Sequence, residues 1–229
     1  MKIVMLLFTG LFLGELINAQ SAVDFANLSK YKDQNTALLN TGKKTDVVFI
    51  GNSITEGWVH QHPEFFSDNH YTGRGISGQT SAQMLLRFQS DVVALKPGVV
   101  VINAGTNDIA ENTGAYNQDF TFNNIKAMAD IAQNNGIKVI LTSVLPAAGF
   151  PWRKEITDAS QKVDALNSRL KQYAHDHKLI YMDYNAAMRD AKGGMREGLS
   201  KDGIHPNIEG YAIMETIAAK IIGKTLGRK

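Results

Sequence analysis

Short apolar runs alternate with longer amphipathic stretches along the chain. The apolar runs, which are rich in β-branched side chains, cover residues 47–50, 99–102, 139–141 and 179–182. Continuous apolar runs of this length are typical of strands that are buried on both faces of a parallel sheet. Apolar residues recur at helical spacing over residues 22–42, 80–91, 120–134, 156–175 and 208–222. The alternation predicts an α/β fold, with helices on both faces of a parallel sheet and right-handed connections.

The amino-terminal residues differ from this pattern. Met1 and Lys2 precede an apolar run from Ile3 to Leu13, and small residues surround Ala19. The run is shorter than the ~20 residues that a membrane span needs, so we expect residues 1–19 to be a secretory signal peptide. A buried amino-terminal helix is the alternative. No linker or repeat interrupts residues 20–229, which we expect to form a single exported domain, periplasmic or secreted.

Composition narrows the range of partners. The 229 residues carry 24 basic and 22 acidic side chains, a formal net charge of +2, and no cysteine. Mixed charge near neutrality gives no electrostatic footprint for a nucleic acid or an anionic membrane, and we expect no stable membrane insertion. Without cysteine, the protein depends on its hydrophobic core rather than on disulfides. The oligomeric state stays open.

Polar residues follow the predicted strands at the points where these end. Ser53 comes just after the first strand, residues 103–108 follow the second, and residues 202–206 lie beyond the last. Because the carboxyl ends of parallel strands meet at one edge of a sheet, we expect these segments to lie close together. Ser53 would also begin a helix, where free N–H groups and the helix dipole stabilise negative charge. A role as a helix cap is the alternative for this serine.

Four segments, taken in order, carry a family resemblance. They are Gly51-Asn52-Ser53-Ile54-Thr55, Gly75-Ile76-Ser77-Gly78-Gln79-Thr80, Gly105-Thr106-Asn107-Asp108 and Asp202-Gly203-Ile204-His205-Pro206. Together they resemble the SGNH (GDSL-type) hydrolases, in the branch similar to platelet-activating-factor acetylhydrolase subunits and bacterial carbohydrate esterases. The resemblance implies a flavodoxin-like three-layer α/β/α sandwich around a five-stranded parallel sheet. It also implies a further strand near residues 70–74.

The same resemblance implies roles for individual residues. Ser53 would be the nucleophile, His205 the general base, and Asp202 the group that orients the imidazole. The oxyanion hole would consist of the Ser53 and Gly78 backbone N–H groups and the Asn107 side-chain amide. No metal or cofactor is implied.

Other residues have weaker assignments. Asn52 stands where the commonest form of the family has aspartate, a change that we expect to affect the turn only slightly. Candidate substrate contacts on the rim are Trp58, Arg74, Trp152 and Arg153, although Trp58 is equally suited to packing. Two His-x-His pairs, at 60–62 and 175–177, lack a third ligand at a characteristic spacing, so we do not expect a metal site. The glycine-rich residues 193–198 fit a mobile lid or a plain flexible loop.

These observations favour a serine esterase that removes short acyl groups, chiefly acetyl, from a carbohydrate. The partner would then be a small-molecule or polysaccharide ester. A lipid-directed acylhydrolase, similar to lysophospholipases or to platelet-activating-factor acetylhydrolases, is the first alternative. A noncatalytic glycan-binding module that kept the fold is the second.

Overall fold

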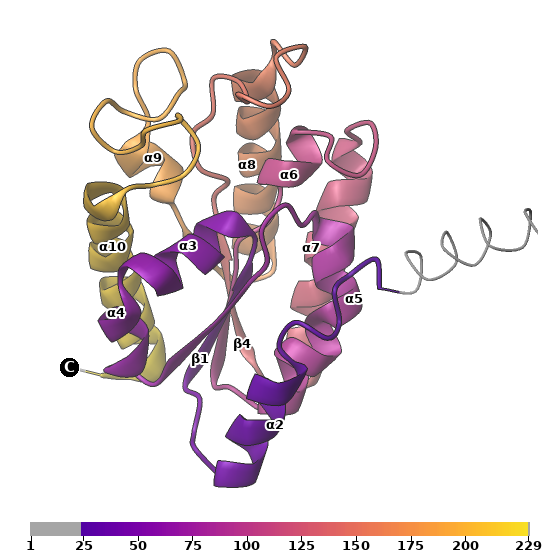
Figure 1. Cartoon of the computed structure of the whole chain (residues 1–229), viewed down its shortest axis with the longest axis vertical. Helices are drawn as coiled ribbons and strands as arrows, with labels where there is room; N and C mark the ends of the chain where they lie inside the picture. The colour runs from indigo at the N-terminus through magenta and orange to yellow at the C-terminus, as the bar shows by residue number, and fades with distance from the viewer. Residues whose placement is uncertain (1–23, 229) are drawn as a thin grey trace, which may run out of the picture.

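A parallel sheet forms the centre of the computed structural model, which describes residues 24–228 (Figure 1). Its strands are β1 (Val47–Gly51), β2 (Tyr71–Gly75), β3 (Val99–Ile102), β4 (Lys138–Thr142) and β5 (Ile180–Met182). They pair in the order β2-β1-β3-β4-β5, and every pairing is parallel. The predicted three-layer α/β/α fold with a five-stranded parallel sheet is therefore confirmed.

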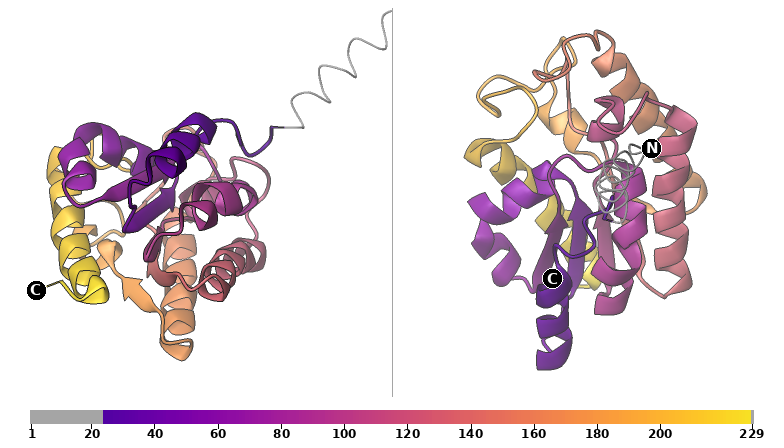
Figure 2. Two further views of the ribbon diagram at one scale, coloured as in Figure 1. Left: turned by 90° about the horizontal axis from the view of Figure 1, so that it is seen from below. Right: turned by 45° about the vertical axis from the view of Figure 1, so that its right-hand side comes forward.

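Helices cover both faces of this sheet (Figure 2). The first face carries α5 (Ser81–Asp91), α7 (Gln118–Asn134) and α8 (Ala159–Asp176). The second carries α3 (Ser53–Gln61), α4 (Pro63–Ser67), α9 (Tyr184–Met188) and α10 (Ile208–Leu226). The remaining elements of the described chain are α2 (Lys32–Thr41), the 3₁₀ turn η1 (Val93–Leu95) and α6 (Thr106–Ile109).

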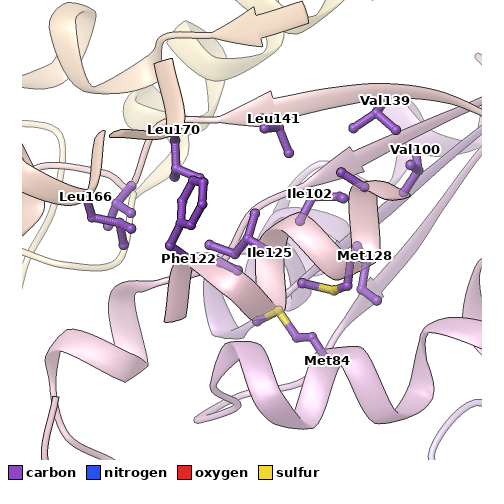
Figure 3. Packing of buried hydrophobic residues seen from close by; sticks show 14 of the residues in the cluster. Met84, Val100, Ile102, Phe122, Ile125, Met128, Val139, Leu141, Leu166 and Leu170 are labelled. Atoms are coloured by element: carbon purple, nitrogen blue, oxygen red, sulfur yellow. The ribbon is translucent and has the colours of Figure 1, made fainter. Parts of the chain in front are cut away.

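The strands bury side chains on both faces, as their apolar runs predict. Successive side chains of a strand point to opposite faces. In β1, Val48 and Ile50 join the cluster beneath α5, α7 and α8, which Figure 3 shows from close by, whereas Val47 and Phe49 join the cluster beneath α3 and α10. The loops after the strands gather at the upper end of the molecule in Figure 1, where the carboxyl ends of the strands lie.

The predicted helix at residues 22–42 is only partly correct. Helix α2 begins at Lys32, and the residues before it form turns. Asn27 has a left-handed backbone with φ of 51°, which interrupts a helix. The carbonyl groups of Phe25 and Ala26 accept hydrogen bonds from glutamine side chains near α5 instead of from helical N–H groups. Tertiary contacts therefore replace local helix formation in this segment.

Two expectations concern the amino-terminal residues and the membrane. The predicted signal peptide, residues 1–19, lies outside the described residues and stays a prediction. None of the helices within residues 24–228 combines the length and the hydrophobicity that a membrane span requires.

Arg87 joins three parts of the fold from a completely buried position. Its guanidinium donates to the Asp91 carboxylate at 3.0 Å, to the Gln79 side chain at 2.6 Å and to the Gly51 carbonyl at 2.8 Å. These contacts connect α5 to the end of β1 and to the loop after β2. Because a buried charge is tolerated only when it is paired and hydrogen-bonded, Arg87 and Asp91 depend on each other.

Replacement of Arg87 tests this dependence. We expect Arg87→Met to lower the free energy of unfolding by about 3–5 kcal/mol, since it leaves the Asp91 carboxylate buried without its partner. Urea unfolding followed by circular dichroism measures the change. Arg196→Met, at an exposed arginine, is the control and should stay within about 0.5 kcal/mol of the wild type. Equal stabilities for the two variants would contradict the dependence.

Candidate active site

Ser53 is the first residue of α3 and follows β1 after a single intervening residue. That residue, Asn52, is completely buried, and its side-chain oxygen accepts the Ile54 backbone N–H at 3.0 Å. This bond caps the helix, so the asparagine retains the capping that the turn needs. Ser53 itself is partly exposed. The turn therefore fixes a serine hydroxyl at the surface, at the amino end of a helix.

His205 and Asp202 meet Ser53 from the loop between α9 and α10. The Ser53 hydroxyl lies 2.9 Å from His205 Nε2, and His205 Nδ1 lies 2.6 Å from Asp202 Oδ2. The other Asp202 oxygen accepts the backbone N–H groups of Ile204 at 2.9 Å and of His205 at 2.8 Å. The structure thus brings these three residues together, although Ser53 and His205 lie 152 positions apart in the sequence.

The hydrogen bonds of Asp202 determine which atoms of Asp202 and His205 carry a proton. Partial burial opposes the charge on Asp202, but hydrogen bonds from the His205 side chain and from the backbone hold its pKa well below its ordinary value. An ionised Asp202 can only accept, so His205 Nδ1 carries the proton and donates it. His205 Nε2 is then free to accept the Ser53 proton. This arrangement can activate the serine as a nucleophile.

The predicted oxyanion donors lie at the start of α3 and in the loops that follow β2 and β3. Gly78 lies in the loop after β2 and has a φ of 79°, a backbone conformation that residues with a side chain rarely adopt. The Asn107 side-chain amide, at the start of α6, donates to the Gln79 carbonyl at 3.0 Å, which connects the two loops. Among residues 24–228, neither the Ser53 nor the Gly78 backbone N–H has a hydrogen-bond acceptor. Both groups are therefore available to a ligand.

Asp108 is a structural residue of the site that the sequence reasoning did not assign. Its buried carboxylate accepts the Ser81 backbone N–H at 2.9 Å and the Ser81 hydroxyl at 2.5 Å. Burial raises the pKa of Asp108, against the opposing effect of these hydrogen bonds. The contacts tie the loop of Asn107 to the start of α5. Only the position of Asp108 next to Asn107 could have indicated this role.

Trp152 forms one wall beside the histidine. The side chain is 43% exposed, and its ring centre lies 6.0 Å from that of His205. Its Nε1 donates to Asn112 Oδ1 at 3.2 Å, and the Asn112 amide donates to the Gly78 carbonyl at 3.1 Å. Asn112 therefore connects the aromatic wall to the loop of Gly78.

Two of the other candidate substrate contacts were wrong. Trp58 is 2% exposed and stacks between Phe65 and Tyr211, so it belongs to the core beneath α3 and α10. Arg74 is 3% exposed, lies over the Tyr31 ring at 4.6 Å and donates to Asn35 at 2.8 Å. Sequence reasoning failed here because the strand and helix that carry these residues turn them inward.

The Arg153 side chain binds other groups of the protein. Its guanidinium donates to the backbone carbonyls of Ala110 and Glu111 and lies 3.3 Å from the Glu155 carboxylate. These contacts fix the loop that carries Trp152 against the segment after α6. These hydrogen bonds give Arg153 a structural role in holding the wall of the site, and its role in substrate binding stays a prediction.

The remaining sequence features are the two His-x-His pairs and the glycine-rich segment 193–198. In the described part of the chain, no group of three or more His, Cys, Asp or Glu side chains is arranged to hold a metal ion. His62 pairs with Glu215 at 2.9 Å, and His175 pairs with Asp176 at 3.1 Å. The glycine-rich segment 193–198 is anchored by backbone hydrogen bonds at both ends rather than standing free as a lid.

Two hollows of about 610 Å³ each flank the molecule. The first lies between α2, the edge strand β2 and α4, and Ser53 does not line it. The second lies between the 148–157 and 190–203 loops and reaches Asp202. Only the second hollow therefore adjoins the Ser53–His205–Asp202 chain.

Comparison with known proteins agrees with this geometry. The model of the GDSL-like Lipase/Acylhydrolase family matches residues 49–213. A GDSL-like lipase from Bacteroides thetaiotaomicron VPI-5482 is 55% identical, with a TM-score of 0.84 over 87% of this chain and 98% of that chain. A protein from Bacteroides fragilis NCTC 9343 is 53% identical, with a TM-score of 0.85 over 89% and 99%. The match to these structures extends over nearly their full lengths.

A more distant relative carries a specific activity in its name. The acetylxylan esterase of Xylanibacter ruminicola is 28% identical over 77% of this chain and 42% of that protein. The chain spans about two fifths of the length of the first curated relatives that it matches. The family match alone covers well over half of the chain. The chain therefore belongs to the GDSL-like lipase/acylhydrolase family.

Proposed function

We propose that the protein is a serine esterase that removes short acyl groups, chiefly acetyl, from a carbohydrate through an acyl-enzyme. The continuous hydrogen-bonded chain from Ser53 through His205 to Asp202 carries this proposal. Membership of the GDSL-like lipase/acylhydrolase family supports ester hydrolysis as the reaction. The exposed Trp152 beside His205 supports a sugar as the alcohol.

Acylation begins at the Ser53 hydroxyl. Its oxygen attacks the ester carbonyl carbon while His205 Nε2 takes the proton, and the adjacent Asp202 carboxylate stabilises the resulting imidazolium. Negative charge develops on the carbonyl oxygen. The Ser53 and Gly78 N–H groups and the Asn107 amide stabilise it by donating hydrogen bonds to this oxygen. Such donors are typically worth about 2.7–4 kcal/mol each. When the tetrahedral intermediate collapses, the C–O bond to the alcohol breaks, and the alcohol leaves with the proton from His205.

Deacylation repeats these steps with water. His205 Nε2 takes a proton from the water, whose oxygen attacks the acyl carbon of the Ser53 ester. The second tetrahedral intermediate collapses, Ser53 recovers its proton from His205, and the carboxylic acid is released. Every proton transfer thus uses the single nitrogen that faces Ser53.

The surroundings of the serine favour a small acyl group and a hydrated alcohol. Asn112 and the backbone of the Gly78 loop place polar groups beside the reaction centre. Trp152 offers an exposed flat ring, and flat aromatic faces pack well on the apolar faces of sugars. The hollow beside Asp202 is lined by a mixture of backbone, charged and apolar groups, which suits a saccharide extension. The similarity to an acetylxylan esterase supports the same substrate class.

Removal of the nucleophile is the first test. We expect Ser53→Ala to lower kcat for p-nitrophenyl acetate by several orders of magnitude, to roughly the level left by triad deletion in other serine hydrolases. The free energy of unfolding should change by only about 1 kcal/mol, because Asn52 caps the helix. Turnover and urea unfolding, measured together, check both expectations. Residual activity close to the wild type would refute the assignment of Ser53.

Substrate length distinguishes the proposal from lipid hydrolysis. Each methylene that finds no apolar wall forfeits up to about 0.8 kcal/mol of burial, so kcat/KM should fall from acetyl to butyryl to octanoyl p-nitrophenyl esters. Acetylated xylo-oligosaccharides should be hydrolysed with a higher kcat/KM than a lysophospholipid. If octanoyl esters or the lysophospholipid are turned over at least as well, the lipid-directed alternative replaces the carbohydrate one.

Trp152→Ala tests the sugar contact within the same assay. We expect KM for the acetylated oligosaccharide to rise by about threefold to tenfold, the loss of a typical aromatic contact. The values for p-nitrophenyl acetate should change much less. Phe120→Ala, at an aromatic that is 56% exposed on α7, is the matched control and should leave both substrates unaffected. Equal losses on the two substrates would assign Trp152 to the support of His205 instead.

A further inference from the structure

The loop after β2 carries the Gly78 donor and is held in place mostly by side chains. We define the oxyanion loop as residues Ile76–Thr80. Its backbone is anchored by the Ile76 N–H, which donates to the Gly51 carbonyl at 3.1 Å. Asn112 donates to the Gly78 carbonyl, and Arg87 donates to the Gln79 side chain. The direction of the Gly78 N–H depends on the peptide unit that joins it to Ser77.

Glu56 holds Ser77 at two points. It lies three residues after Ser53 in α3, so the two side chains lie on the same face of the helix. Glu56 Oε2 accepts the Ser77 backbone N–H at 2.8 Å and the Ser77 hydroxyl at 2.5 Å. One carboxylate oxygen therefore fixes both the backbone and the side chain of the residue that precedes Gly78.

This contact restricts the oxyanion donor itself. The peptide unit between Ser77 and Gly78 is planar, so its orientation is set by the backbone of Ser77 at one end and of Gly78 at the other. The Gly78 end has the permissive backbone of glycine, with a φ of 79°. An anchored Ser77 supplies the rigidity that the glycine does not.

The second oxygen of the carboxylate is also engaged. Lys30 Nζ lies 3.1 Å from Glu56 Oε1. Burial alone would raise the pKa of Glu56, but hydrogen bonds from Ser77 and Lys30 outweigh burial and lower it. Glu56 therefore remains ionised with both oxygens occupied. A carboxylate in this state is suited to holding neighbouring groups and not to donating a proton.

We propose that Glu56 is a positioning residue of the oxyanion hole, acting through Ser77, and that Lys30 holds the Glu56 carboxylate in turn. Lys30 precedes α2 and lies outside residues 49–213, which the family model matches. The inference rests on the proposed serine-esterase mechanism, because the oxyanion hole has a function only in that chemistry.

Kinetics of Glu56 variants test the proposal. We expect Glu56→Ala to lower kcat for p-nitrophenyl acetate by about tenfold to a hundredfold, less than the loss of a donor itself. KM should stay within about twofold, because the effect is confined to the transition state. Glu56→Gln should recover part of the rate, since its amide oxygen can still accept the Ser77 N–H. Glu64→Ala, at an exposed glutamate on α4, is the matched control and should behave as the wild type.

A double-mutant cycle separates positioning from general destabilisation. Ser77→Ala removes only the hydroxyl contact, so we expect a drop in kcat of about twofold to fivefold. Glu56→Ala combined with Ser77→Ala should be no slower than Glu56→Ala alone, because both changes break one interaction. Additive losses, a change in KM alone, or a wild-type kcat in Glu56→Ala would overturn the proposal. Thermal unfolding of each variant establishes that it is folded, and Ser77→Ala keeps the test available if Glu56→Ala does not fold.

A fluorophosphonate distinguishes failure of this inference from failure of the proposed substrate. Its phosphoryl oxygen needs the oxyanion hole when Ser53 is labelled, whatever the natural ester is. Slower labelling of Glu56→Ala than of the wild type would support the positioning role even if no acetylated sugar were hydrolysed. Equal labelling rates would refute it even if the sugar esters were good substrates.

Discussion

The pairing of β1 with β2 is the constraint on which the site depends. The last pair in the register is Gly51 with Gly75, so both strands end at the same level of the sheet. A side chain on Gly75 would begin 2.2 Å from the Glu56 backbone nitrogen and 2.6 Å from the Asn52 carbonyl oxygen. Only glycine permits this approach. The turn of Ser53 and the loop of Gly78 consequently start side by side, so the proposed nucleophile and its proposed oxyanion donor need no long loop to approach each other.

Charged groups support this edge of the sheet in two ways. Buried ionisable residues hold the framework: Arg87 donates to the Gly51 carbonyl beneath the turn of Ser53, and Asp108 accepts the Ser81 N–H at the start of α5. Partly exposed charges act at the surface, where Asp202 orients His205 and Glu56 anchors Ser77. The buried groups cost much to desolvate and fix the backbone, whereas the exposed groups remain close enough to water to stay ionised. Stability and chemistry therefore draw on different carboxylates of the same site.

The sequence predicted the sheet well wherever a strand is apolar throughout. The run from Val47 to Ile50 is apolar throughout, and it lies within β1. Strand β2 reads Tyr-Thr-Gly-Arg-Gly and could not be found from hydrophobic periodicity. Among its residues, Tyr71 joins the core cluster beneath α3 and α10. The buried Arg74 side chain packs on the Tyr31 ring and donates a hydrogen bond to Asn35. Its existence followed from the family resemblance alone.

The same limit explains the errors in the candidate site. The family resemblance implied the triad of Ser53, His205 and Asp202. The sequence pattern had already placed these residues beyond the ends of strands, and parallel strands end at one edge. Trp58 and Arg74 lie near the motifs in sequence, but one is on the inward face of α3 and the other points from β2 beneath the N-terminal segment. Tryptophan and arginine occur at both buried and exposed positions, so the residue type does not reveal whether the side chain points into the core or toward the site. The role of Glu56 was hidden for a related reason, since its partner Ser77 is distant in sequence.

The wall of the site and the oxyanion loop are not independent parts. Asn112 accepts the Trp152 indole N–H and donates to the Gly78 carbonyl, so it connects the aromatic ring beside His205 to the loop that presents the Gly78 N–H. Arg153 fixes the base of this connection through the Ala110 and Glu111 carbonyls. A ligand that packs on Trp152 therefore contacts a side chain that is hydrogen-bonded, through Asn112, to the loop of the Gly78 N–H. Because the proposed sugar contact and the proposed oxyanion donor share this unit, contacts to the alcohol would contribute to kcat as well as to affinity.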